Sequence, residues 1–308
     1  MPAEQIAIVE TTIQLAVNNA NAGDTIRVGP GRWCGARITK ALDLVGEGAT
    51  IMGCPPGNPG PVGNAFRIGF RINTVASGTS ISNFVFDGAG YSDTNRVPLE
   101  TGVVTGLGTN DVVIDSNTFL GGLSGVTINN GNNVQVTHNV FDGFTILSDG
   151  SGGYAILDQG ASATGNAILY NQITATVPPG DFSFASWIGE ADVPFAGILV
   201  SGENGTIIAN NKISITANPH GDGGVGILTT DNLFGFTTSN LAITNNDGRG
   251  SAYGLIITND QFGGNGNTLG AVIRGNFGIN LINGSTSNVT NRSIRTLLLC
   301  DPTTGVCP

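Results

Sequence analysis

Short aliphatic stretches recur along this chain, and each one leads into an asparagine. The copies lie at 112–119 (VVIDSNTF), 134–141 (VQVTHNVF), 167–173 (AILYNQI) and 206–213 (TIIANNKI), with looser copies at 241–248 and 271–278. Apolar and polar residues alternate within each copy, which predicts a short β-strand. Successive asparagines are 22, 32, 40, 35 and 30 residues apart. The pattern therefore predicts constant strands joined by loops of varying length.

The repeated asparagines predict that the copies stack on one another. They are Asn117, Asn139, Asn171, Asn211, Asn246 and Asn276. If neighbouring strands lie about 4.8 Å apart, each amide can hydrogen-bond to the next one and so remain satisfied when buried. We also expect these asparagines to adopt the left-handed conformation that a bend between strands requires. An earlier copy at 79–86 has Phe84 in place of the asparagine.

This repeat resembles the right-handed parallel β-helix of the pectate-lyase-like superfamily, over roughly residues 10–285. The resemblance implies an all-β fold whose members include polysaccharide lyases, hydrolases, epimerases and non-enzymatic surface proteins. We expect one domain over 1–308, with about eight or nine rungs at 24–280 and a C-terminal cap at 281–308.

Residues 11–22 form the only good helix candidate. Ile13, Ala16 and Val17 share one face, and Thr11 and Gln14 have the spacing of a capping box. Such an N-terminal helical cap would cover the open end of the coil.

Composition narrows the classes of partner. The chain has 48 glycines, only 11% charged residues and a net charge of −10. With two lysines, Lys40 and Lys212, it lacks the clustered cations that nucleic-acid binding needs. No apolar run approaches the ~20 residues of a membrane span, so we expect no membrane insertion.

The four cysteines form one pair near each end, Cys34 with Cys54 and Cys300 with Cys307. This arrangement is compatible with two disulfides and an oxidising compartment, or with four free thiols. The first residues contain no signal peptide. A secreted or cell-surface protein in its mature form would have such a sequence, and so would a cytosolic protein.

A third strand follows each variable loop, at 125–129, 154–158, 197–201, 226–230 and 254–258. In the lyases that the chain resembles, substrate lies on the sheet flanked by the long loops, which here is this one. Alternation places a mostly aliphatic row outward: Thr127, Ile156, Leu199, Leu228 and Ile256. A second, polar outward row contains Asn129, Asp158, Ser201, Thr230 and Thr258. The aliphatic row must be covered by a loop, a partner chain or a sugar.

This sheet and its loops supply the candidate chemistry. If the protein is an enzyme, Asp158 is the acid or a metal ligand, and Arg249 or His220 is the base that takes a sugar proton. A hydrolase would pair Asp158 with a second carboxylate. His220 is also compatible with a plain turn residue.

Binding roles fall on neighbouring positions. Trp187 is a candidate platform for a sugar ring or a plug over the aliphatic row, and Asn129, Thr230 and Thr258 are candidate substrate contacts. Loop acids are candidate ligands for Ca²⁺, or else ordinary solvated side chains. They are Asp149, Glu190, Asp192 and Asp222.

Two functions therefore stand at this stage. The first is a secreted carbohydrate-active protein that binds or cleaves a polysaccharide on the third-strand sheet. The alternative is a structural or cell-surface module that self-associates as a homo-oligomer through the aliphatic row.

Overall fold

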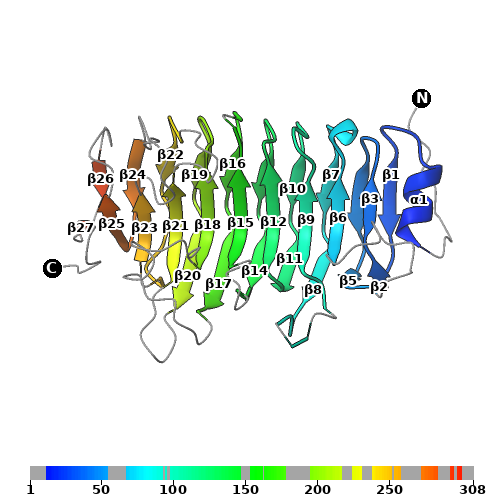
Figure 1. Cartoon of the computed structure of the whole chain (residues 1–308), viewed down its shortest axis with the longest axis horizontal. Helices are drawn as coiled ribbons and strands as arrows, with labels where there is room; N and C mark the ends of the chain where they lie inside the picture. Colours follow the sequence, from blue (N-terminus) through cyan, green and yellow to red (C-terminus); the bar gives the residue numbers. More distant parts are fainter. Residues whose placement is uncertain are drawn as a thin grey trace.

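The computed structural model describes residues 12–54, 67–92, 94–95, 98–146, 153–161, 163–177, 195–216, 224–230, 238–251, 253–257, 272–283, 292–294 and 297–299. In these residues the chain forms a right-handed parallel β-helix, with helix α1 (Ile13–Asn19) at one end and strand β27 at the other (Figure 1). The predicted fold class is confirmed.

Three parallel sheets form the faces of the coil. Sheet A contains β1 (Thr25–Val28), β4 (Asp43–Gly46), β7 (Ser80–Ser82), β10 (Val113–Asp115), β13 (Gln135–Thr137), β16 (Ala167–Leu169), β19 (Ile207–Ala209), β22 (Ala242–Thr244), β24 (Val272–Asn276) and β26 (Arg292–Ile294). Sheet B contains β2 (Gly31–Cys34), β5 (Ala49–Met52), β8 (Val85–Gly88), β11 (Thr118–Gly121), β14 (Val140–Asp142), β17 (Gln172–Thr176) and β20 (Lys212–Thr216).

Sheet C contains β3 (Ala36–Ile38), β6 (Ile68–Ile72), β9 (Thr101–Thr105), β12 (Ser124–Asn129), β15 (Tyr154–Gln159), β18 (Ala196–Ser201), β21 (Val225–Thr230), β23 (Tyr253–Ile257), β25 (Ile279–Asn283) and β27 (Leu297–Leu299). A short 3₁₀ helix, η1 (Thr74–Ala76), precedes β7. In the described part of the chain, sheets A and C have ten strands and sheet B has seven. The predicted number of rungs, eight or nine, lies between these strand counts. Strands β25, β26 and β27 continue sheets A and C beyond residue 280, into the segment expected to be a cap.

Equivalent residues of successive rungs stack inside the coil. Ile114 pairs with Val136, which pairs with Ile168, and all three are fully buried. In sheet B the rings of Phe119 and Phe141 are parallel, with centroids 4.7 Å apart. These columns of identical contacts bury the apolar positions that the alternation predicts.

The predicted asparagine ladder is present. All six asparagines are at most 1% exposed. Each amide donates to the next Oδ1, for example Asn139 Nδ2 to Asn171 Oδ1 at 3.1 Å and Asn171 Nδ2 to Asn211 Oδ1 at 3.0 Å. The ladder begins at Phe84, the residue that stands in place of an asparagine one rung before Asn117. The backbone N–H of Phe84 donates to Asn117 Oδ1 at 3.0 Å.

One detail of the ladder prediction is wrong. The ladder asparagines are absent from the residues with positive φ, and the residue before each takes the left-handed conformation instead. Examples are Ser116 (φ 57°), His138 (53°) and Tyr170 (57°). The bend therefore turns the asparagine side chain inward while its predecessor absorbs the backbone strain.

Helix α1 is shorter than the expected 11–22. Its N-cap is Thr12, whose Oγ1 accepts from Leu15 N at 3.2 Å, and Thr11 of the predicted capping box lies outside the described residues. The Gln14 side chain instead accepts from Arg37 N on β3 at 2.8 Å. Ile13, Ala16 and Val17 are buried, as the helical pattern predicts.

The disulfide between Cys34 and Cys54 is formed, with Cα atoms 5.6 Å apart. It ties β2 to the segment that follows β5. Closing a loop of this length stabilises the fold by about 3 kcal/mol. Cys300 and Cys307 lie outside the described residues.

A candidate ligand pocket on sheet C

The register of sheet C differs from the prediction by one residue at β15. Tyr154 pairs with Ser124, so Ile156 stacks on Val126, Asp158 on Ile128 and Gln159 on Asn129. A shift of one residue moves every side chain to the other face. Ile156 and Asp158 therefore point inward, while Leu157 and Gln159 take the outward positions.

The predicted outward placement of Asp158 is consequently wrong. Its side chain is 0% exposed and sits inside the coil. Asn166 Nδ2 donates to its Oδ1 at 3.0 Å, and Thr206 Oγ1 donates to its Oδ2 at 3.2 Å. Burial raises the pKa of Asp158 to about 7, although these two hydrogen bonds lower it. A carboxyl in this position cannot act on a substrate lying on the outer surface of the sheet.

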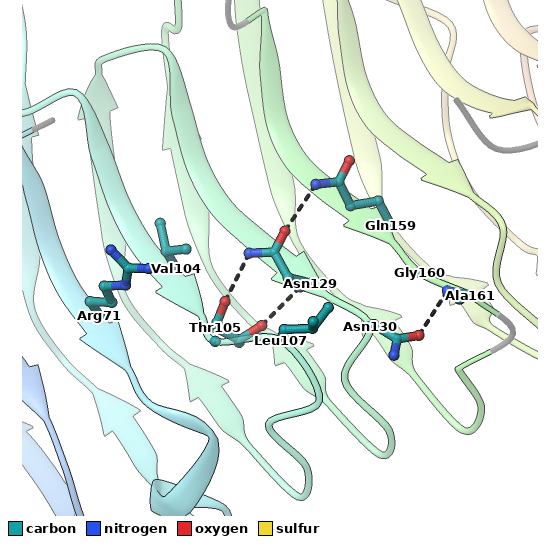
Figure 2. Close-up of a pocket in the computed structure, with 10 residues that line it drawn as sticks. Arg71, Val104, Thr105, Leu107, Asn129, Asn130, Gln159, Gly160 and Ala161 are labelled. Carbon is teal, nitrogen blue, oxygen red and sulfur yellow. Dashed lines mark hydrogen bonds between the residues drawn. The ribbon is translucent and has the colours of Figure 1, made fainter. Parts of the chain in front are cut away.

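A pocket of about 540 Å³ lies on the outer surface of sheet C, at the carboxyl ends of four strands. Its lining residues come from β6, β9, β12, β15 and the turns that follow (Figure 2). They are Arg71, Val104, Thr105, Gly106, Leu107, Asn129, Asn130, Gln159, Gly160 and Ala161. The predicted contact residue Asn129 lies near the centre of this set.

A hydrogen-bonded row of polar groups crosses three strands at the pocket. Gln159 Nε2 donates to Asn129 Oδ1 at 2.9 Å, and Asn129 Nδ2 donates to Thr105 O at 2.8 Å. Figure 2 shows both bonds, with the three residues side by side on neighbouring strands. Each amide has two N–H groups and two acceptor lone pairs on its oxygen. The row therefore holds its members in fixed positions and leaves hydrogen-bonding capacity for a ligand.

The pocket also contains a cationic side chain and apolar side chains. Arg71 is exposed and, among the described residues, has no ion-pair partner. Leu107 is 73% exposed, and Val104 is half-buried on the same outer row as Arg71. The pocket thus combines a guanidinium, three side-chain amides and an apolar rim, a combination that suits a ligand with hydroxyl groups and apolar ring faces.

No carboxylate is among the ten residues that line the pocket. Most glycoside hydrolases use a pair of carboxyl groups that flank the scissile bond. The arrangement of these described residues supports binding and orientation of a ligand and supplies no acid and base pair.

Arg249, the predicted base, lies in the turn before β23. Its Nε and Nη2 donate to the two carboxylate oxygens of Asp247 at 2.8 and 2.6 Å, and its guanidinium lies 5.5 Å from the ring centroid of Phe277. These bonds lower the pKa of Asp247, and that carboxylate raises the pKa of Arg249. The ion pair therefore stabilises the protonated form of Arg249, which cannot accept a proton from a substrate.

The other predicted site residues remain predictions. The described part of the chain excludes Trp187, His220, Thr258, Asp149, Glu190, Asp192 and Asp222. The backbone of Thr230 pairs with Ser201 at the end of β21, and Ser201 pairs with Gln159. The structure thus brings Asn129 into the pocket and places Thr230 at the equivalent strand position further along sheet C.

Sequence reasoning missed Gln159, Arg71 and Leu107. The sequence does contain a signal for the outward position of Gln159, namely the register of β15. Ala155 occupies the strand position that is glycine in β9, β12, β18 and β21. Aligning Ala155 with Gly125 gives the observed register. Arg71 falls on an alternating strand and Leu107 in a turn, and neither pattern indicates a pocket in the sequence alone.

The outer aliphatic row is covered over part of its length. Leu199 and Leu228 point outward, yet they are 3% and 1% exposed within a single chain. Leu157, one rung nearer the pocket, is half-buried. The predicted covering of this row is therefore present at two rungs, and the face opens toward the pocket.

No protein-family model matches the chain, and no curated protein sequence matches it significantly. Among solved structures, the chain is similar to the enzymatically active domain of tailspike protein 2 of bacteriophage CBA120, at 13% identity and a TM-score of 0.41, over 94% of this chain and 44% of that one. It is also similar to the catalytic domain of a GH87 α-1,3-glucanase in complex with tetrasaccharides, at 14% identity and a TM-score of 0.35, over 96% and 68%.

A third similar structure is PfbA, a surface adhesin of Streptococcus pneumoniae, at 12% identity and a TM-score of 0.27, over 93% of this chain and 88% of that one. At these identities the similarity concerns the fold alone. The chain spans less than half the length of the tailspike domain that it matches. Among the described residues, no helix is long and apolar enough to cross a membrane.

Proposed function

We propose that this protein is an extracellular carbohydrate-binding β-helix protein that holds a segment of polysaccharide in the sheet C pocket. The observation that carries the proposal is the row of Thr105, Asn129 and Gln159, in a pocket that also contains the exposed Leu107 and Arg71. Among the described residues Arg71 has no ion-pair partner. Amides in a fixed row suit sugar hydroxyls, and an apolar rim suits the ring face. The disulfide between Cys34 and Cys54 agrees with an oxidising compartment.

Binding without cleavage is the form of this function that the pocket supports. None of the described residues that line it is a carboxylate, and the carboxyl of Asp158 faces the interior. Arg71 gives the pocket a positive group in a chain of net charge −10. We therefore expect a preference for sugars that carry a carboxylate or sulfate, which a guanidinium binds through two parallel hydrogen bonds.

The test is a glycan array followed by calorimetric titration of the best ligand. Arg71→Ala should weaken binding about tenfold, the equivalent of about 1.4 kcal/mol. Arg274→Ala is the matched control, because Arg274 is also exposed but lies on sheet A. Equal affinities of the wild type and Arg71→Ala would count against this pocket, and unchanged binding by Asn129→Ala as well would exclude it.

A further inference from the structure

A second buried carboxyl lies beside Asp158 and has no hydrogen-bond partner. Glu203 is 0% exposed, in the turn between β18 and β19, and neither of its carboxylate oxygens has a partner among the described residues. A buried charge is tolerated only when it is paired or coordinates an ion. This side chain therefore needs an additional binding partner.

The position of Glu203 is fixed by the backbone of the neighbouring rung. A Cβ added at Gly160 would fall on Glu203 Oε1, and the Oδ1 of Asn130 lies 3.0 Å from the same point. Gly160 is two residues beyond Asp158, whose carboxyl also points inward. The lack of a side chain at Gly160 thus makes room for the second carboxyl next to the first.

The two carboxyls interact through their charges. Burial and then the charge of Asp158 raise the pKa of Glu203 to about 9. No hydrogen bond between the two contributes to either pKa, and no cationic side chain of the described chain does. Asn166 and Thr206 both donate to Asp158, which favours its ionised form. Among the described residues, the two buried carboxyls thus interact with no cationic side chain beside them and with both oxygens of Glu203 unsatisfied.

We propose that Asp158 and Glu203 bind one calcium ion inside the coil, beneath the turn that forms one end of the pocket. Two carboxylates balance one divalent cation, and the carboxylate oxygens of Glu203 gain the partner that they lack. Calcium accepts oxygen ligands in flexible geometry at 2.3–2.6 Å, whereas magnesium keeps several waters and gives them up reluctantly. A buried site built from carboxylate oxygens therefore favours calcium.

A proton is the alternative partner for Glu203. A protonated Glu203 carboxyl would have an O–H donor, and that donor finds no acceptor among the described residues. The cation satisfies both oxygens at once, so it explains the geometry better.

The test measures thermal unfolding of the full chain after removal of metal with EDTA and then with added CaCl₂ at about pH 8, without any glycan. Calcium at about 100 times its Kd should raise Tm by about 5 °C. The rise should disappear in Glu203→Gln and persist in Glu47→Gln, whose glutamate is exposed on the surface. At about pH 5 protons compete for the carboxylates, so the shift should shrink.

Direct measurement of bound calcium after gel filtration provides the second readout. One ion per chain, lost in Glu203→Gln and in Asp158→Asn, supports the site. If the wild type shows no calcium shift, or if Glu203→Gln keeps the full shift, the carboxyls hold protons and the proposal is overturned. Should Glu203→Gln not fold, Asp158→Asn gives the same comparison. A shift produced equally by MgCl₂ would also contradict the calcium assignment.

Discussion

At each bend between sheets A and B, one residue turns an amide inward and the residue before it adopts the left-handed backbone conformation. The ladder asparagine, such as Asn171, turns its amide inward and is 1% exposed, while Tyr170 before it takes a φ of 57° and is 54% exposed. The left-handed position accepts Ser, His, Tyr, Asn or Gly along the chain. The inward position accepts only a side chain that both donates and accepts, and this explains the constancy of asparagine there.

The ladder predicts a large loss of stability when one amide is removed. In Asn171→Ala, the backbone N–H and the Nδ2 of Asn139 both lose the acceptor Asn171 Oδ1. Leaving buried donors unsatisfied should lower the free energy of unfolding by about 2–4 kcal/mol. Chemical denaturation measures this loss. Gln172→Ala, exposed and next in sequence, is the control and should change stability by less than about 0.5 kcal/mol. Equal effects of both substitutions would refute the ladder's role.

The buried acids predict a pH dependence with a definite sign. The pKa values of Asp158 and Glu203 are raised to about 7 and about 9, so between about pH 4 and pH 9 the folded chain binds more protons than the unfolded chain. The contribution of these two carboxyls to the free energy of unfolding is therefore largest below about pH 4, and it is lost as the pH rises through 7 and then 9. In calcium-free buffer, Tm should therefore fall more steeply with pH in the wild type than in Glu203→Gln. Parallel Tm profiles of the two proteins would contradict this.

At the scale of the strand, small residues in sheet C make room for large ones from sheet B. A Cβ at Gly125 would meet the ring of Phe141 and lie 2.8 Å from the carbonyl oxygen of Ala155. The glycine of the sheet C strand thus leaves the space that a stacked ring of sheet B occupies. In β15 the equivalent position is Ala155 and not glycine. The predicted register of that strand is therefore wrong by one residue.

Gly125→Ala should therefore destabilise the coil, even though alanine restricts the unfolded chain more than glycine does. Overpacking against Phe141 should cost about 1–3 kcal/mol. Gly29→Ala is the matched control, because no atom lies within 4 Å of the added Cβ and its φ is not positive. Urea denaturation of both variants compares them. A stabilised Gly125→Ala would show that the strand can move away from sheet B.

At the scale of the whole molecule, the repeat made the coil predictable and left the pocket unpredicted. Stacked rungs follow from the spacing of aliphatic residues and asparagines, because each rung repeats the same local chemistry. The pocket depends on the register of one strand and on two side chains, Arg71 and Leu107, brought together from β6 and from the turn after β9. Contacts of this kind arise between rungs and have no signature within any one of them.

The same register decides which acids face outward. Asp158 reads as a surface residue from sequence, yet the pairing of Tyr154 with Ser124 places it inside the coil beside Glu203. The amide of Gln159 occupies the outward position in its place, so an amide faces the pocket where the sequence predicted a carboxyl.

The most direct test of the proposed function is a crystal structure of the protein with the oligosaccharide that the glycan array selects. We predict sugar density on the outer surface of sheet C, with hydroxyl groups within hydrogen-bond distance of Asn129 and Gln159 and an acidic group at Arg71. Density on sheet A or sheet B, with the sheet C pocket filled only by solvent, would contradict the proposal.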